Sequence, residues 1–237
     1  MLNYVAARER IVEYIKENQM KEGDRLPSET ELSKVLGVSR LTLREAMNSL
    51  KSEGKIYAIQ GKGTFVSWET ENIENLLNNN LGVTEMIRAN GFQPGVGKFS
   101  KRLVRADKSI ADGLGVPEGI DVLMCSRVRL ADDVPVALTK DHMSAKIAQK
   151  FLGSMDENVS LYDFIEKDCG LSIGTCRTEM IPVSADAEVA DALEVPEGTL
   201  LMGFRVCLKD IYGEPLIYAV EFFRTDKFKF VVMRKRK

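Results

Sequence analysis

The stretch from Leu26 to Val66 restricts the fold of this chain more than any other part of its sequence. Near its start, the run Ser28-Glu29-Thr30-Glu31 places a serine three residues before a glutamate, a pattern that caps the first turn of a helix. Gly37 suits the left-handed conformation that ends a helix in a tight turn. The pattern therefore predicts a short helix, a tight turn and a second helix that begins after Ser39.

This second helix, expected through about Ser52, has an apolar stripe and a polar one. Four polar residues fall on one face at helical spacing, namely Arg40, Arg44, Asn48 and Lys51. A helix that enters the major groove of DNA directs its N-terminal residues toward base edges and phosphates. The residues that suit these contacts here are Ser39, Arg40, Thr42 and Arg44. If the helix were considered alone, the ordinary alternative to a DNA-contacting face would be a charged face exposed to solvent.

A glycine-punctuated hairpin follows this helix. Residues 56–59 and 64–66 have strand patterns, and Gln60, Gly61, Lys62 and Gly63 form the turn between them. The glycines allow the backbone to approach a phosphate or the minor groove, and Lys62 adds positive charge. With a helix predicted over residues 4–18, the stretch reads as a winged helix-turn-helix.

These motifs resemble the DNA-binding domain of the GntR family of bacterial transcription regulators. The resemblance covers the first 66 residues and rests on L-P-S-E, V-S-R-x-T-x-R-x-A and Q-G-K-G-T-F-V. It implies that double-stranded operator DNA is a partner. The chain departs from many members at Thr30, where they have an arginine. The expected DNA contacts are Ser39, Arg40, Thr42, Arg44, Gln60, Gly61, Lys62 and Gly63.

A chain of 237 residues can hold two domains. We expect the DNA-binding domain over residues 1–68, a polar linker or partly helical hinge over residues 69–80, and a second domain over residues 81–237. Residues 1–68 carry eleven Lys and Arg against nine Asp and Glu, and the remainder carries 22 against 26. This basic excess is small for a nucleic-acid binder, so the position of the charges matters more than their number.

Several classes of protein do not fit the sequence. No apolar run approaches the roughly 20 residues of a membrane span, and charged residues interrupt the N-terminus where a signal peptide is apolar. The four cysteines form no C-x-x-C pair, and His142 is the only histidine. We therefore expect a cytoplasmic protein with no membrane partner, no metal site and no cofactor.

The second domain contains an internal repeat. ADKSIADGLGVPEG at residues 106–119 matches ADAEVADALEVPEG at residues 185–198 in nine of fourteen positions. Further along, residues 126–130 align with residues 204–208, which places Arg127 opposite Arg205. Each copy predicts a strand, a short helix, a turn and a hairpin. Two copies predict halves paired about a pseudo-twofold axis in one sheet, with helices on one face from residues 144–152 and 160–168.

Two arginines mark a candidate ligand site in this domain. Arg127 and Arg129 alternate with apolar residues, so both point to one face of a strand. Burying them without an anionic partner is costly, although exposure to solvent or pairing with Asp132 and Glu221 is an equal alternative. Ser160 begins a predicted helix, whose free amides favour an anion, or it is a simple N-cap.

Residues 83–230 resemble the effector domain of the HutC subgroup of GntR regulators, called UTRA, which shares the chorismate-lyase fold. The resemblance rests on S-R-V-R-L, S-L-Y-D-F, A-L-E-V-P-E-G and F-F-R-T-D. It implies a small metabolite, often a phosphorylated sugar, as effector. Thr139 replaces a glutamate of many members, which argues against an amino-sugar effector, and Thr225 replaces a glycine. His142, three residues beyond Thr139, is a pocket residue or a structural one. The implied effector residues are Arg127, Arg129, Ser160, Tyr162, Glu221 and Arg224.

The sequence thus predicts an α+β protein: a winged helix-turn-helix joined to a chorismate-lyase-like domain with an antiparallel sheet and a pseudo-repeat. Its expected function is that of an effector-responsive transcription repressor that binds operator DNA as a homodimer and responds to a sugar phosphate or another small anion. The alternatives are an enzyme related to chorismate lyase, for which no nucleophile and base pattern is present, and a winged-helix module that binds protein.

Overall fold

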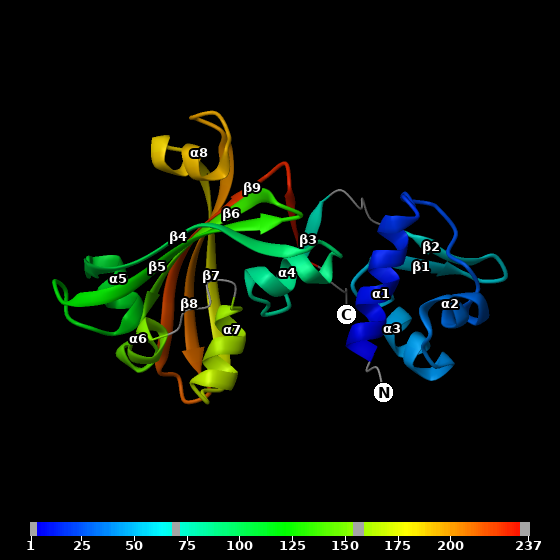
Figure 1. Ribbon diagram of the computed structural model, residues 1–237, viewed down its shortest axis with the longest axis horizontal. Helices are drawn as coiled ribbons and strands as arrows, with labels where there is room; N and C mark the ends of the chain where they lie inside the picture. The colour runs from blue at the N-terminus through cyan, green and yellow to red at the C-terminus, as the bar shows by residue number, and fades with distance from the viewer. Residues whose placement is uncertain (1–3, 68–71, 154–158, 233–237) are drawn as a thin grey trace, which may run out of the picture. The chain divides into compact units, whose positions relative to one another are not determined.

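The computed structural model describes residues 4–67, 72–153 and 159–232. The chain separates into two compact units, and Figure 1 labels their helices and strands. Unit 1 comprises Met1–Asn79, Met86–Phe92 and Lys229–Lys237, and unit 2 comprises Asn80–Glu85 and Gln93–Phe228. Within the described ranges, no helix combines the length and the apolar character needed to cross a bilayer.

Unit 1 begins with three helices, α1 (Tyr4–Glu17), α2 (Glu29–Leu36) and α3 (Arg40–Ser52). The predicted capping box is confirmed: the Ser28 hydroxyl accepts from the Glu31 amide at 3.3 Å, and the Glu31 carboxylate accepts from the Ser28 amide at 2.9 Å. Gly37 ends α2 in the left-handed conformation, at φ 63° and ψ 33°. This conformation turns the chain sharply, so that α3 can begin after its own cap, Ser39.

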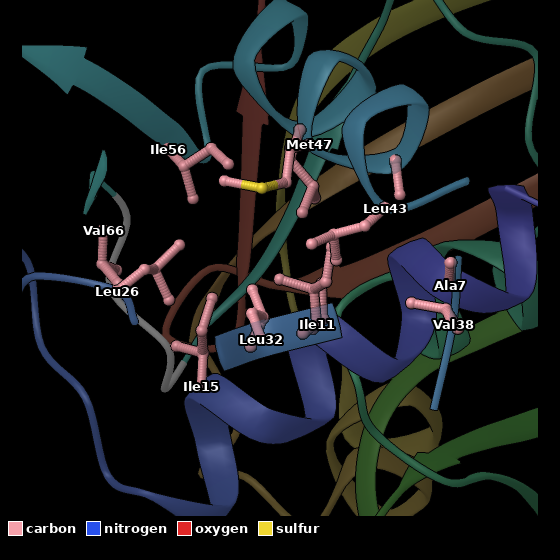
Figure 2. Close-up of a cluster of buried hydrophobic side chains, with 13 residues drawn as sticks. Ala7, Ile11, Ile15, Leu26, Leu32, Val38, Leu43, Met47, Ile56 and Val66 are labelled. Carbon is pink, nitrogen blue, oxygen red and sulfur yellow. The ribbon is translucent and has the colours of Figure 1, made fainter. Parts of the chain in front are cut away.

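An apolar core joins these helices to the wing (Figure 2). The wing consists of strands β1 (Ile56–Ile59) and β2 (Gly63–Val66), which pair antiparallel. Ile56 pairs with Val66, and both side chains are buried beside Ile11 of α1 and Met47 of α3. Each fully buried aliphatic side chain contributes about 1.5 to 3 kcal/mol, so this core fixes the wing against the helices.

The expected linker contains a strand. Ile73–Leu76 forms β3, which pairs with β10 (Phe228–Val231) in a two-stranded sheet. The Leu77 amide continues this pairing by donating to the Val231 carbonyl at 2.9 Å. The expectation of a partly helical segment is therefore wrong over residues 73–76, because a partner strand from the far end of the chain extends the backbone.

Helix α4 (Val83–Ala89) begins in unit 2 and ends in unit 1, where Asn90 follows it. The Asn90 Oδ1 atom accepts from Lys55 Nζ at 2.6 Å and from the Glu74 amide at 3.2 Å. Its Nδ2 donates to the carbonyls of Glu74 and Met86 at 3.0 and 2.8 Å. Asn90 thus connects the start of the wing, β3 and the end of α4 within unit 1.

Unit 2 is built on a six-stranded antiparallel sheet that confirms the predicted repeat (Figure 1). One half comprises β4, helix α5, β5 and β6, and the other comprises β7, helix α8, β8 and β9. The strand order β4-β5-β6-β9-β8-β7 places the halves symmetrically, with β6 and β9 at the centre. The bounds are β4 Pro94–Arg105, α5 Lys108–Leu114, β5 Asp121–Ala131, β6 Val134–Met143, β7 Ile173–Ser184, α8 Ala187–Leu193, β8 Leu200–Asp210 and β9 Pro215–Arg224.

The strand register corrects one part of the repeat alignment. Phe99 of β4 pairs with Arg127, and the equivalent pair in the other half is Thr178 with Val206. Arg127 therefore corresponds to Val206, whereas the sequence alignment had placed it opposite Arg205. The alignment was wrong by one residue, and such a slip exchanges the two faces of a strand.

Helices cover both faces of the sheet, whereas the sequence predicted helices on one face only. On one face, α5 and α8 pack against apolar side chains of the strands. The other face carries Arg127 and Arg129, and α4, α6 (Ala145–Leu152) and α7 (Leu161–Asp163, continued by a π-helical turn over Phe164–Asp168) lie on this side. Because helices shield both faces from water, the side chains on each face must be apolar or must find hydrogen-bond partners within the protein.

The buried Lys55 makes the stability of unit 1 sensitive to pH. Its side chain is 3% exposed, and burial lowers its pKa from 10.5 to about 8. Between pH 8 and 10.5 the unfolded chain binds a proton at Lys55 that the folded chain has lost, so stability rises with pH in this range. Relative to Lys55→Met, the wild type should gain about 3 kcal/mol of unfolding free energy across it.

Urea unfolding at a series of pH values measures this difference. Lys34→Met, at an exposed lysine of the same unit, controls for general effects of pH. A difference between wild type and Lys55→Met that stays constant from pH 8 to 10.5 would contradict the prediction.

Candidate nucleic-acid interface and effector site

The first turn of α3 presents its polar side chains to solvent. The Ser39 hydroxyl caps the helix by accepting from the Thr42 amide at 3.2 Å, and it lies 2.8 Å from the Thr42 hydroxyl. Arg40 is exposed and makes no hydrogen bond or ion pair within the described residues. Arg44, also exposed, pairs with Glu29 of α2 at 3.0 Å. The helix thus brings Ser39, Arg40, Thr42 and Arg44 onto one accessible turn.

The wing presents its turn in a similar way. Gln60, Gly61 and Lys62 are exposed at its tip, and Gly63 is half-buried at the start of β2. Gly61 has φ 76° and Gly63 has φ 123°, conformations that favour glycine. A Cβ atom on Gly63 would lie only 2.7 Å from Arg25 Nε. The wing therefore places Arg25 beside its backbone, a basic side chain that sequence reasoning missed.

In unit 2, Arg127 and Arg129 lie on the same face of β5 and are buried, with exposed fractions of 4% and 2%. Arg127 donates from Nη2 to Asp141 Oδ2 at 3.1 Å and from Nη1 to the Val159 carbonyl at 3.1 Å. The Thr139 hydroxyl also donates to Asp141 Oδ2, at 3.2 Å. Asp141 comes from β6, and it is the anionic partner that the sequence analysis did not identify.

Arg129 has a neutral partner instead, because its Nη2 donates to the Thr84 hydroxyl of α4. Burial lowers its pKa to about 10, and the charge of Arg127 acts in the same direction. The neighbouring Glu85 accepts from the Ser160 hydroxyl at 2.6 Å. The first turn of α4 is therefore attached both to an arginine and to the N-cap of α7. We call Thr84, Glu85, Arg127, Arg129, Thr139, Asp141, Ser160 and Glu221 the arginine cluster.

Three side-chain atoms of this cluster are buried without a hydrogen-bond partner, namely Arg127 Nε, Arg129 Nε and Glu85 Oε2. Only one other side-chain atom in the described part of the chain has this property, Ser144 Oγ. Buried polar groups are nearly always paired in folded proteins, and each exception calls for an explanation such as strain, a functional role or a bound water or ion. The unpaired atoms therefore favour a binding role over a purely structural one.

Glu221 of β9 pairs in register with Thr139 and lies on the arginine face. Burial raises its pKa to about 8, with Asp141 acting in the same direction and both arginines opposing. Tyr162 of α7 donates to Asn80 Oδ1 at 2.9 Å. Burial raises the pKa of its hydroxyl, and the charges of Cys176 and Glu221 act in the same direction. The structure thus places Tyr162 and Glu221 close to each other.

Two other residues singled out in the sequence lie on the opposite face of the sheet. Arg224 lies three residues after Glu221 in β9, so the two side chains are on opposite faces of the strand. Arg224 pairs with Asp226 at 2.7 Å and donates to the Pro135 and Leu193 carbonyls. His142 is bonded to the Tyr218 carbonyl at 3.1 Å and pairs in register with Tyr218. The structure therefore does not bring Arg224 or His142 together with Arg127.

Comparison with known proteins agrees with this arrangement. The model of the gntR family of bacterial regulatory proteins matches residues 3–66, and the UTRA domain model matches residues 89–229. The transcriptional repressor NagR of Bacillus subtilis is 29% identical over 96% of this chain and 93% of its own length. The transcriptional regulator GgaR of Escherichia coli is 26% identical over 96% of this chain and 89% of its own.

Among solved structures, PhnF from Mycobacterium smegmatis covers 98% of this chain and 100% of its own, with a TM-score of 0.63 and 24% identity. The possible transcriptional regulator YydK of Bacillus subtilis has a TM-score of 0.58 and 21% identity, over 99% and 100%. These likenesses support the fold. The chain belongs to the GntR family of bacterial regulatory proteins, in its HutC subgroup with a UTRA domain, whose members are effector-responsive DNA-binding transcription regulators and not enzymes.

Proposed function

We propose that this chain is a cytoplasmic repressor that binds a near-palindromic operator as a homodimer through α3 and the wing. A small polar metabolite that binds at the arginine cluster would release it from DNA. A ligand can cause such a release only if it binds the DNA-incompetent state more tightly than the competent one.

The observation that carries the DNA-binding part is the accessible first turn of α3. Arg40 has no role in holding the fold, and Arg44 makes only an exposed ion pair, which contributes little to stability. Exposed arginines at the start of such a helix suit guanine edges and phosphates. The small charge excess of this region favours two copies acting together, as two half-sites of a palindrome require.

The proposal that an effector binds at the arginine cluster is supported by its buried atoms without a hydrogen-bond partner. The oxygen atoms of a metabolite would be natural acceptors for the two guanidinium groups. A curated relative, the mannosyl-D-glycerate transport/metabolism system repressor MngR of Escherichia coli, is 28% identical over 99% of this chain and 96% of its own. Its name connects that relative with the transport and metabolism of mannosyl-D-glycerate, and we propose a sugar-derived effector for this chain as well.

Replacing either arginine of α3 should weaken specific DNA binding without affecting the fold. For Arg40→Ala and Arg44→Ala we expect a loss of about 1 to 3 kcal/mol, or about 5-fold to 150-fold in Kd. The DNA would be a duplex enriched from a random library by the wild-type chain, and fluorescence anisotropy at fixed salt would measure affinity. Arg102→Ala, at an exposed arginine of β4, is the matched control. Equal affinities for all three variants would refute the assignment.

The arginine cluster should also control the response to metabolites. In a thermal-shift screen of sugars, sugar acids and sugar phosphates, we expect a stabilising compound to lose its effect in Arg129→Gln and to keep it in Arg102→Gln. The same compound should release the wild type from its selected duplex. A compound that releases DNA equally well from both variants would place the effector site elsewhere. Sedimentation of the free protein and of the complex would establish whether one or two copies bind.

A further inference from the structure

The arginine cluster contains its own counter-charges. Asp141 is paired with Arg127 at 3.1 Å, and the side chains of both are about 95% buried. Glu85, held by Ser160, is close enough for its charge to act on Arg129. Two carboxylates thus accompany two guanidinium groups, and the net charge of these four groups is zero.

Two other ionisable groups lie near the two arginines, Glu221 of β9 and Lys101 of β4. Glu221 is largely protonated at neutral pH because burial raises its pKa to about 8, and where it ionises it adds a negative charge. Lys101 of β4 directs its amine to the Phe151 carbonyl at 3.1 Å and over the Phe151 ring. Glu221 therefore supplies no cation, and the Lys101 amine keeps its charge but is engaged by the carbonyl and the ring of Phe151.

The unpaired atoms show which contacts are still available. Arg127 Nε and Arg129 Nε each have a donor to offer, and Glu85 Oε2 can accept. A ligand that presents both acceptors and a donor, such as hydroxyl, amide or heterocyclic groups, would satisfy all three. A dianionic phosphate group has acceptors only, so it cannot itself pair with the Glu85 oxygen, and it brings two negative charges beside Asp141 and Glu85.

From this geometry we infer that the effector carries at most one negative charge and presents hydrogen-bond donors as well as acceptors, so that it is not a phosphate dianion. The inference rests on the proposed function, because it assumes that the arginine cluster is the effector site. Asp141 is its determinant: it occupies an Nη donor of Arg127 and compensates its charge. A buried pair of this kind resists an added like charge, because no solvent is present to screen it.

Removing the charge of Asp141 should admit a dianion. We would follow thermal unfolding of the full chain in sodium sulfate and in sodium chloride of equal ionic strength, with sulfate as the dianionic probe. Asp112→Asn, at an exposed aspartate of α5, is the matched control and also reports the general stabilisation by sulfate. We expect Asp141→Asn to rise by about 3 °C more in sulfate than the control does. Wild type and control should respond alike.

A sulfate response of the wild type that exceeds the control and disappears in Arg129→Gln would overturn the inference, because it would show that the cluster already binds a dianion. An Asp141→Asn response equal to that of the control would overturn it as well, provided circular dichroism shows a native fold. Asp141→Ser serves as the second variant if Asp141→Asn does not fold. These results are separate from the DNA-release screen: a phosphorylated compound that releases DNA through Arg129 would leave the proposed function standing and remove only the charge limit.

Discussion

Unit 2 depends on the pairing of two guanidinium groups that lie on one face of a central strand. An arginine taken out of water needs partners for both its charge and its donors. Arg127 obtains them from Asp141 on β6 and from the Val159 carbonyl before α7, and Arg129 from Thr84 on α4. The partners thus come from three separate segments. Their positions explain why the start of α4 and the segment before α7 lie on this face: each supplies an arginine with a hydrogen-bond acceptor in addition to what the sheet offers.

Comparison of the two repeat halves shows that the arginine pair occurs in only one of them. In the second half of the sheet, the positions equivalent to Arg127 and Arg129 are Val206 and Leu208, both buried. The two halves share a fold, but only the first carries arginines at these equivalent positions. Phe204 and Phe223 pack there with ring centroids 5.0 Å apart. The second half therefore supplies an apolar wall, and the symmetry of the sheet does not produce a second site.

Local patterns predicted much of this structure. The capping box at Ser28, the turn at Gly37 and the wing glycines were readable because each involves residues close together in sequence. Strand alternation correctly placed Arg127 and Arg129 on one face. What the sequence could not show were contacts between distant segments, such as β3 with β10 or Glu85 with Ser160. The sequence alignment of the two repeat copies was wrong by one residue in the strand for another reason. The matching helix and turn sequences did not determine which face the residues of the following strand occupy.

Arginine is used in opposite ways in the two units, and burial decides the difference. Arg40 and Arg44 remain in water, so their charge costs little to maintain and is available to any polyanion that approaches. Arg127 and Arg129 have lost that hydration, so their choice of ligand depends on the charges already beside them. An exposed arginine selects mainly by geometry once an anion is bound. In unit 2, if the arginine cluster is the effector site as we propose, Asp141 and Glu85 would select by charge, and the number of arginines alone would be a poor guide to the ligand.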